Sequence, residues 1–232
     1  FDILFCAPNH QTFVIDEDLI KDTNIKCILS PSTGLNHIDV DSVPIVSVKN
    51  DKVIYDVWST AEHTLYLMLS IVRGKHELHE KILGIIGYGR LGKMVETLCK
   101  PLFKKIISVD KGDSLDELYE KSDMVSIHMD YNPTTEYMID NEFLSHFKKN
   151  IYLINTARGE IVNEQDIKHL LSVGRIKGYA TDVLQTEYNE QKSVFYGVDY
   201  VITTPHIAGT SIEAQEKTYK RVLEKWNNMN KK

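Results

Sequence analysis

Three polar segments of the chain carry side chains that could move a proton beside a bound carboxylate. Arg158 lies in Asn-Thr-Ala-Arg-Gly, Glu187 ends a segment that begins Ala-Thr-Asp-Val, and His206 lies in Pro-His-Ile-Ala-Gly. Histidine is the most frequent general acid or base, and the planar guanidinium of arginine suits a carboxylate. Each segment follows an apolar, β-branched run, so we expect all three at the carboxyl ends of strands, where open α/β sheets bind ligands. Taken singly, each residue would more often be a surface or packing residue.

A glycine-rich turn predicts a dinucleotide site. Gly87 begins the pattern Gly-Tyr-Gly-Arg-Leu-Gly, which follows a strand-like run and opens a helix-like one, and Asp110 lies 18 positions after Gly92. Gly87 would permit the tight turn, Gly89 would let the backbone approach a pyrophosphate, and Gly92 would let helix and strand pack closely. Asp110 would bind the ribose hydroxyls and repel a 2′-phosphate, which favours NAD over NADP, although Lys111 could weaken that exclusion. The alternative is a structural turn with an incidental acid.

The elements that must position these residues alternate along the chain. Apolar runs predict nine strands, several of them apolar on both faces as in a parallel sheet covered by helices. They are Ile3–Cys6, Ile25–Leu29, Ile45–Val48, Ile82–Gly87, Lys105–Asp110, Met124–Met129, Ile151–Thr156, Ile176–Asp182 and Tyr200–Thr204. Helices are predicted over 56–73, 91–100, 163–174 and 211–228. This alternation predicts an α/β fold with a Rossmann-type, doubly wound parallel sheet.

With these motifs, the chain resembles the D-isomer-specific 2-hydroxyacid dehydrogenase family. The family's Asn-Thr-(Ala/Ser)-Arg-Gly motif matches Asn155–Gly159, and its Pro-His-(Ile/Leu)-(Ala/Gly)-Gly motif matches Pro205–Gly209. Ala61–His63 is similar to the family's interdomain helix, and Thr33–Asp39 to its substrate-side loop. The resemblance covers almost the whole chain, with several motifs in the family's order. It implies hydride transfer between NAD(H) and C2 of a small D-2-hydroxy acid or 2-oxo acid.

The resemblance also implies roles for individual residues. His206 would exchange the proton of the substrate hydroxyl, Glu187 would orient the imidazole and favour its cation, and Arg158 would hold the carboxylate. Backbone N–H groups near Thr33 and Gly34 would assist Arg158 in substrate binding. The residues implied in cofactor binding are Gly87, Gly89, Arg90, Leu91, Gly92, Asp110, Thr156, Ala157, Asp182 and His206.

Some of these assignments keep alternatives open. Glu187 is followed by Tyr188, where the family usually has proline, and Glu190 is a nearby competitor for its role. Asp182 is implied to bind the nicotinamide carboxamide. His63 and His128 are interpreted as structural residues rather than catalytic ones.

The family comparison predicts two domains and three departures. We expect an NAD-binding domain over 55–207 and a smaller, discontinuous, flavodoxin-like α/β substrate domain from 1–54 and 208–232, which lacks the family's first strand–helix unit. The joints near 73/74 and 110/111 are abrupt for the family, and we hypothesise that residues are missing there.

The composition of the chain argues against nucleic acid, membranes and metal ions as partners. The 232-residue chain has a net charge of −6 with acids and bases interspersed, so it has no basic stripe for nucleic acid. No apolar run approaches the roughly 18 residues of a membrane span. The three cysteines are odd in number and widely separated, which predicts reduced thiols and a cytoplasmic protein, with no metal site.

The expected assembly is a homodimer, because the apolar helix over 56–73 exceeds what one domain needs and the corresponding region pairs in the family. Two other functions remain open at this point. One is a non-catalytic NAD-sensing protein, as in corepressors that resemble the family. The other is an enzyme for a different substrate on the same scaffold, such as formate or phosphite.

Overall fold

The chain divides into two compact units. The computed structural model describes residues 2–6, 14–35, 37–185 and 193–229. One unit comprises Thr60–Ala208, and the other combines Phe1–Ser59 with Gly209–Lys232. The predicted catalytic Glu187, with its neighbour Tyr188 and its competitor Glu190, lies outside the described residues.

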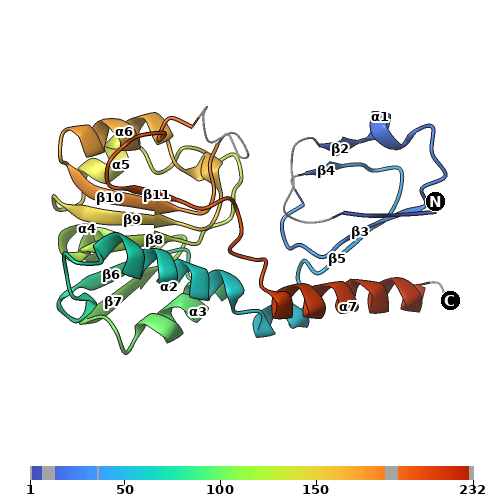
Figure 1. Ribbon diagram of the computed structural model, residues 1–232, viewed down its shortest axis with the longest axis horizontal. Helices are drawn as coiled ribbons and strands as arrows, with labels where there is room; N and C mark the ends of the chain where they lie inside the picture. The colour runs from blue at the N-terminus through green and yellow to red at the C-terminus, as the bar shows by residue number, and fades with distance from the viewer. Residues whose placement is uncertain (1, 7–13, 36, 186–192, 230–232) are drawn as a thin grey trace. The chain divides into compact units, whose positions relative to one another are not determined.

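The larger unit is built on a six-stranded, fully parallel sheet (Figure 1). Its strands follow the spatial order β11-β10-β9-β8-β6-β7, so the chain changes direction across the sheet between β7 and β8. The central strands are buried along their whole length, as expected for strands covered on both faces. The strands are β6 (Ile82–Ile86), β7 (Lys105–Val109), β8 (Met124–Ile127), β9 (Ile151–Asn155), β10 (Ile176–Thr181) and β11 (Val201–Thr203).

Helices cover both faces of this sheet (Figure 1). On one face, α2 (Ser59–Val72) contacts α3 (Arg90–Cys99) where Met68 meets Cys99. On the other lie α4 (Asp116–Lys121), α5 (Asn141–Ser145) and α6 (Glu164–Ser172). Tyr119 of α4 packs edge-on against Phe147, just beyond α5. The α/β, doubly wound prediction is therefore confirmed.

Helix ends follow the capping residues of the sequence. Asn163 caps α6, because its side chain accepts a hydrogen bond from the amide of Asp166, and Gly174 has a positive φ of 66° just beyond the helix. The helix predicted from Asp56 instead begins at Ser59, because Val57 is extended and follows a separate 3₁₀ helix, η1 (Lys52–Asp56).

Both abrupt joints are hydrogen-bonded turns. After α2, the amides of Lys75 and His76 donate to the carbonyl of Val72 (2.9 and 3.1 Å). After β7, the amide of Asp113 donates to the carbonyl of Asp110 at 3.1 Å. Each joint is a compact turn, and the hypothesis that residues are missing there stays a prediction.

The smaller unit contains a parallel three-stranded sheet, ordered β1-β3-β5, and a two-stranded parallel pair. The strands are β1 (Ile3–Phe5), β2 (Ile15–Asp16), β3 (Cys27–Ser30), β4 (Ile38–Asp39) and β5 (Ile45–Ser47), and the short helix α1 spans Glu17–Ile20. The long helix α7 (Ile212–Met229) packs on β3 and β5, where Val222 joins Cys27, Leu29 and Val46 in a buried cluster.

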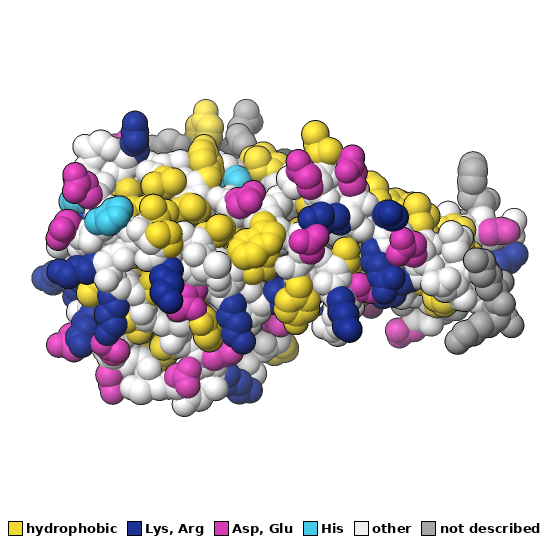
Figure 2. Space-filling view, turned by 90° about the horizontal axis from the view of Figure 1, so that it is seen from below, with side chains coloured by type: hydrophobic (Ala, Val, Ile, Leu, Met, Phe, Trp, Pro, Cys, Tyr) yellow, Lys and Arg dark blue, Asp and Glu magenta, His cyan; other side chains and the backbone are white. Residues whose placement is uncertain are grey.

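Neither the surface charge on the face seen in Figure 2 nor the helices of the described residues show a specialised pattern. Over the described residues seen in Figure 2, basic and acidic side chains alternate rather than gather by sign. Within the same described part of the chain, no helix combines the length and apolar character needed to cross a bilayer.

Candidate functional site

One edge of the six-stranded sheet gathers the polar motifs. β9, β10 and β11 are parallel neighbours, so their carboxyl ends share that edge. Arg158 lies just after β9, Asp182 directly after β10, and His206 just after β11. Main-chain hydrogen bonds join the three segments, because the amide of Asp182 donates to the carbonyl of Asn155 (3.0 Å) and the amide of His206 to the carbonyl of Asp182 (2.9 Å).

The glycine-rich turn connects β6 to α3 at the same edge. Gly87 has a φ of 91°, and a Cβ there would lie 2.6 Å from the backbone of His128 and Met129, so no larger residue fits. A Cβ on Gly92 would lie 2.3 Å from the carbonyl oxygen of Gly87. These contacts hold the helix close to the strand.

Gly89 has the opposite environment. It is the N-cap of α3, no side chain caps the helix there, and a Cβ on Gly89 would meet nothing within 4 Å. Arg90 and Leu91 form the first turn of the helix. The helix N-terminus therefore offers amide donors and the positive end of its dipole beside open space, which suits a pyrophosphate.

Two carboxylates lie together at the end of β7. Asp110 follows the strand and is exposed, and its Oδ1 accepts a hydrogen bond from the amide of Lys111 (2.9 Å). Asp113 turns back, so that its Oδ2 accepts from the amide of Asp110 (2.8 Å). The sequence motif indicated only the first acid, and the turn adds the second.

Asn155 shapes the loop that carries Arg158. Its Oδ1 accepts from the amide of Ala157 (3.0 Å), and its Nδ2 donates to the carbonyl of Arg158 (2.9 Å). The Arg158 guanidinium donates to the carbonyl of Ala157 (2.6 Å). A Cβ on Gly159 would lie 2.2 Å from the carbonyl carbon of Leu184, so only glycine lets this loop pack against the segment that follows β10.

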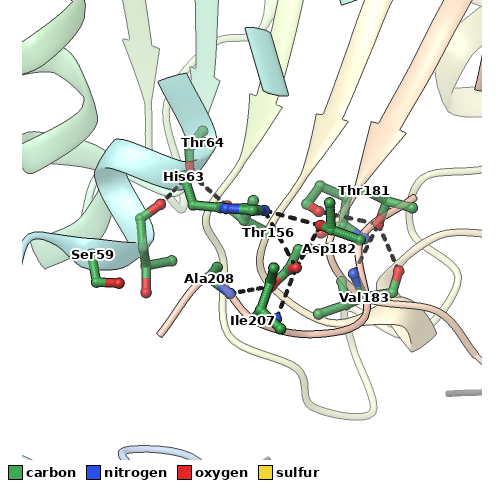
Figure 3. Close-up of polar contacts among 12 residues, drawn as sticks. Ser59, His63, Thr64, Thr156, Thr181, Asp182, Val183, Ile207 and Ala208 are labelled. Atoms are coloured by element: carbon green, nitrogen blue, oxygen red, sulfur yellow. Dashed lines mark hydrogen bonds and ion pairs between the residues drawn. The ribbon is translucent and has the colours of Figure 1, made fainter. Parts of the chain in front are cut away.

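Asp182 is a buried carboxylate with several donors (Figure 3). Its oxygens accept hydrogen bonds from the Thr204 hydroxyl (2.6 Å) and from the amides of Ile207 (3.0 Å) and Ala208 (2.8 Å), and His63 Nε2 lies 3.4 Å away. Burial alone would raise the pKa of Asp182, but the hydrogen bonds from His63, Thr204 and the two amides outweigh it and hold the pKa below its usual value. The carboxylate is therefore ionised at neutral pH.

These bonds hold His206 in an unusual backbone conformation. His206 has a φ of 52°, in the left-handed region, which costs a non-glycine residue about 1–2 kcal/mol. Each hydrogen bond to a charged group contributes about 1.5–3 kcal/mol. The two amide bonds to the Asp182 carboxylate are thus enough to maintain the turn.

His63 and Thr204 belong to this site, although the sequence interpretation made His63 only structural. His63 reaches across from α2, and its Nε2 lies 2.9 Å from the Thr204 hydroxyl oxygen. These two residues are 141 positions apart, so no local pattern could pair them. The match of Ala61–His63 to a family motif was the one available signal.

The predicted substrate-side residues Thr33 and Gly34 lie in the other unit. Thr33 is exposed, and the carbonyl of Gly34 accepts a hydrogen bond from the Ser32 hydroxyl (2.7 Å). Thr33, Gly34 and Glu187 therefore stay predictions as site residues, as does the contact of Asp182 with a nicotinamide carboxamide.

A parallel sheet of this order, with a glycine turn after its first strand and acids after its second, defines a Rossmann-type dinucleotide-binding domain. Residues 70–208 match the family "D-isomer specific 2-hydroxyacid dehydrogenase, NAD binding domain". The chain belongs to this family of NAD-dependent oxidoreductases.

Two relatives similar to the chain in sequence are a dehydrogenase and a reductase. The chain is 28% identical to the D-specific alpha-keto acid dehydrogenase of Enterococcus faecium, over 88% of this chain and 76% of that protein. It is 31% identical to the glyoxylate reductase of Thermofilum pendens, over 93% and 74%. That alignment runs over 257 positions, more than the 232 residues of the chain, so the relative has residues within the matched region that this chain does not have.

Two solved structures similar to the chain are dehydrogenases with NAD bound. The NAD-dependent formate dehydrogenase from Staphylococcus aureus in complex with NAD matches with a TM-score of 0.84 at 27% identity, covering 99% of this chain and 80% of that one. The D-lactate dehydrogenase from Aquifex aeolicus, complexed with NAD and lactic acid, matches with a TM-score of 0.80 at 26% identity, covering 99% and 83%.

Proposed function

We propose that this protein transfers a hydride between NAD(H) and C2 of a small D-2-hydroxy acid or 2-oxo acid. The observation that carries the proposal is the shared sheet edge, where Arg158, Asp182 and His206 follow three neighbouring strands of the sheet that also carries the glycine turn. An imidazole and a guanidinium beside a dinucleotide site supply the groups that this oxidation needs.

Each residue has a separate part in the reaction. Bound NAD supplies the acceptor for the hydride that leaves C2. His206 takes the hydroxyl proton as the C2–O bond becomes a carbonyl, and returns a proton in the reverse direction. Arg158 holds the substrate carboxylate through its planar fork, and Glu187 orients the imidazole. In the smaller unit, backbone N–H groups near Thr33 and Gly34 are the proposed substrate-side donors.

The cofactor site fits NAD by its own geometry. The open space at Gly89 and the uncapped start of α3 suit the pyrophosphate, and Asp110 suits the ribose hydroxyls. Thr156, Ala157 and Asp182 complete the proposed contacts on the nicotinamide side.

A panel of 2-oxo acids tests the proposal. Purified protein with NADH is assayed against glyoxylate, pyruvate and longer 2-oxo acids, and separately with NAD and formate, by absorbance of NADH. Turnover of a 2-oxo acid is expected. Tight NADH binding with no turnover of any of these compounds would instead identify an NAD-sensing protein. Turnover of formate alone would identify formate, rather than a 2-oxo acid, as the substrate.

Cofactor choice yields the first prediction. Replacing Asp110 with Ser removes the charge that would face a 2′-phosphate, so the ratio of kcat/KM for NADPH to that for NADH should rise by about 10- to 100-fold. Asp113→Asn, combined with Asp110→Ser, should raise it further, because Asp113 lies against the same turn. Glu120→Gln, an exposed acid of α4, is the matched control. An unchanged ratio in the double variant would remove both acids from cofactor choice.

The homodimer is a second proposal, and α2 supports it. Tyr66 and Leu69 of this helix are 53% and 46% exposed, and they lie three residues apart on one helix face, so they offer apolar surface that a second copy would cover. The double variant Tyr66→Glu, Leu69→Glu should run as a monomer in light scattering after size exclusion, while Ile212→Glu, an exposed apolar site on α7, should not change the mass. A monomeric wild-type protein would contradict the proposal.

A further inference from the structure

Three consecutive backbone amides donate to a single residue in the turn that carries His206. The amide of His206 donates to the main-chain carbonyl of Asp182, that of Ile207 to its Oδ1, and that of Ala208 to its Oδ2, at 2.9, 3.0 and 2.8 Å. Asp182 therefore fixes both the position and the left-handed conformation of His206. Any group that holds the Asp182 carboxylate in place therefore also sets the position of the His206 backbone, from which the imidazole projects.

The carboxylate is fixed in turn by Thr204 and by His63, whose ring points toward Asp182 in Figure 3. The Thr204 hydroxyl donates its one proton to Asp182 Oδ1 at 2.6 Å, so its oxygen can only accept from His63 Nε2 at 2.9 Å. His63 Nε2 must therefore carry a proton and donate it. The resulting chain runs from the His63 imidazole through the Thr204 hydroxyl to the Asp182 carboxylate.

Helix α2 gives this chain a fixed starting point. Thr64, next to His63, is fully buried, and its hydroxyl lies 2.8 Å from that of Thr156 in the loop that leads to Arg158. Figure 3 shows the two side chains leaving the same part of α2 toward Thr156 and Asp182. One stretch of helix thus contacts both the Arg158 loop and the His206 turn.

We propose that His63 is a positioning residue for the hydride-transfer reaction, which acts through Thr204 and Asp182 to hold the His206 turn in register with the Arg158 loop. This inference rests on the proposed function for the role of His206. The hydrogen-bonded chain from His63 through Thr204 to Asp182 does not depend on the proposed function.

The experiment compares two pairs of variants. His63→Leu and Thr204→Val remove the donor of each link with little change in size, while His63→Gln and Thr204→Ser keep a donor. His169→Ala, an exposed histidine on α6, is the control. Hydrogen exchange of the Ile207 and Ala208 amides is measured for each purified protein, together with kcat and KM for NADH with glyoxylate and with pyruvate.

If the proposal holds, His63→Leu and Thr204→Val speed exchange of these amides by about tenfold or more, because the turn opens more often. They also lower kcat by about 10- to 100-fold, the size expected for a displacement of about 1 Å, with a much smaller change in KM for NADH. His63→Gln and Thr204→Ser recover most of both quantities, and His169→Ala changes neither. Unchanged exchange in His63→Leu and Thr204→Val overturns the proposal.

A double-variant cycle separates this inference from the proposed function. In a His206→Asn background, adding His63→Leu should lower the residual rate no further, because His63 acts through His206. A second full loss would overturn the positioning role. Full turnover by His206→Asn alone would overturn the role of His206, whereas the exchange data would still decide whether His63 holds the turn.

Discussion

Replacing His206 with Asn should lower kcat by about 10²–10⁴-fold, the usual contribution of a general acid or base, while NADH binding changes little. The choice of Asn follows from the backbone, because His206 has a φ of 52° and Asn tolerates the left-handed region better than Ala does. His206→Ala adds backbone strain of about 1–2 kcal/mol to the loss of the imidazole. The two variants together separate the chemistry from the turn.

The measurement is a steady-state assay with NADH and a 2-oxo acid, combined with an NADH titration followed by fluorescence. His146→Asn, next to α5, provides a matched substitution away from this edge of the sheet. A kcat for His206→Asn within a few-fold of the wild-type protein would show that another group exchanges the proton. A loss of NADH binding equal to the loss of kcat would instead indicate a role in holding the cofactor.

The main strands were predictable because their pattern is strong and local. All nine predicted strands occur in the structure, with ends shifted by one or two residues, and β3, β8 and β9 are buried along their whole length. The two strands that were not predicted, β2 and β4, are two residues long, and each buries only one of its residues. So short a pair has almost no periodicity to detect, and its pairing depends on contacts between Ile15 and Ile38, far apart in the chain.

The site divides in the same way. Gly87, Gly92 and Asp110 were predictable, since one local motif specifies the turn, the helix packing and the acid. The role of His63 was not predictable, because it depends on contacts with Thr204 and Asp182 from distant segments. The motif shows Gly159 only as its last residue, whereas the physical reason for a glycine there is that the backbone of Leu184 lies against it. Sequence patterns identify residues that act within one turn, and the fold supplies the partners.

Substitutions of Arg158 should also lower activity strongly, but by weakening substrate binding rather than proton transfer. Lysine keeps the charge but not the planar, bidentate fork that grips a carboxylate, so Arg158→Lys should lower kcat/KM for the 2-oxo acid by about 100-fold, and Arg158→Ala by more. The main change is expected in KM for the 2-oxo acid, while KM for NADH stays close to the wild-type value. Arg73→Lys, an exposed arginine just after α2, is the matched control.

Chemical rescue distinguishes a lost guanidinium from a damaged loop. Asn155 holds the Arg158 carbonyl and the Ala157 amide through its own side chain, so the loop backbone should survive removal of the guanidinium. Added guanidinium ions should then restore part of the activity of Arg158→Ala in proportion to their concentration, and should do nothing for His206→Asn. Should guanidinium fail to restore Arg158→Ala while its melting temperature matches the wild-type protein, Arg158 would not be the group that binds the substrate carboxylate.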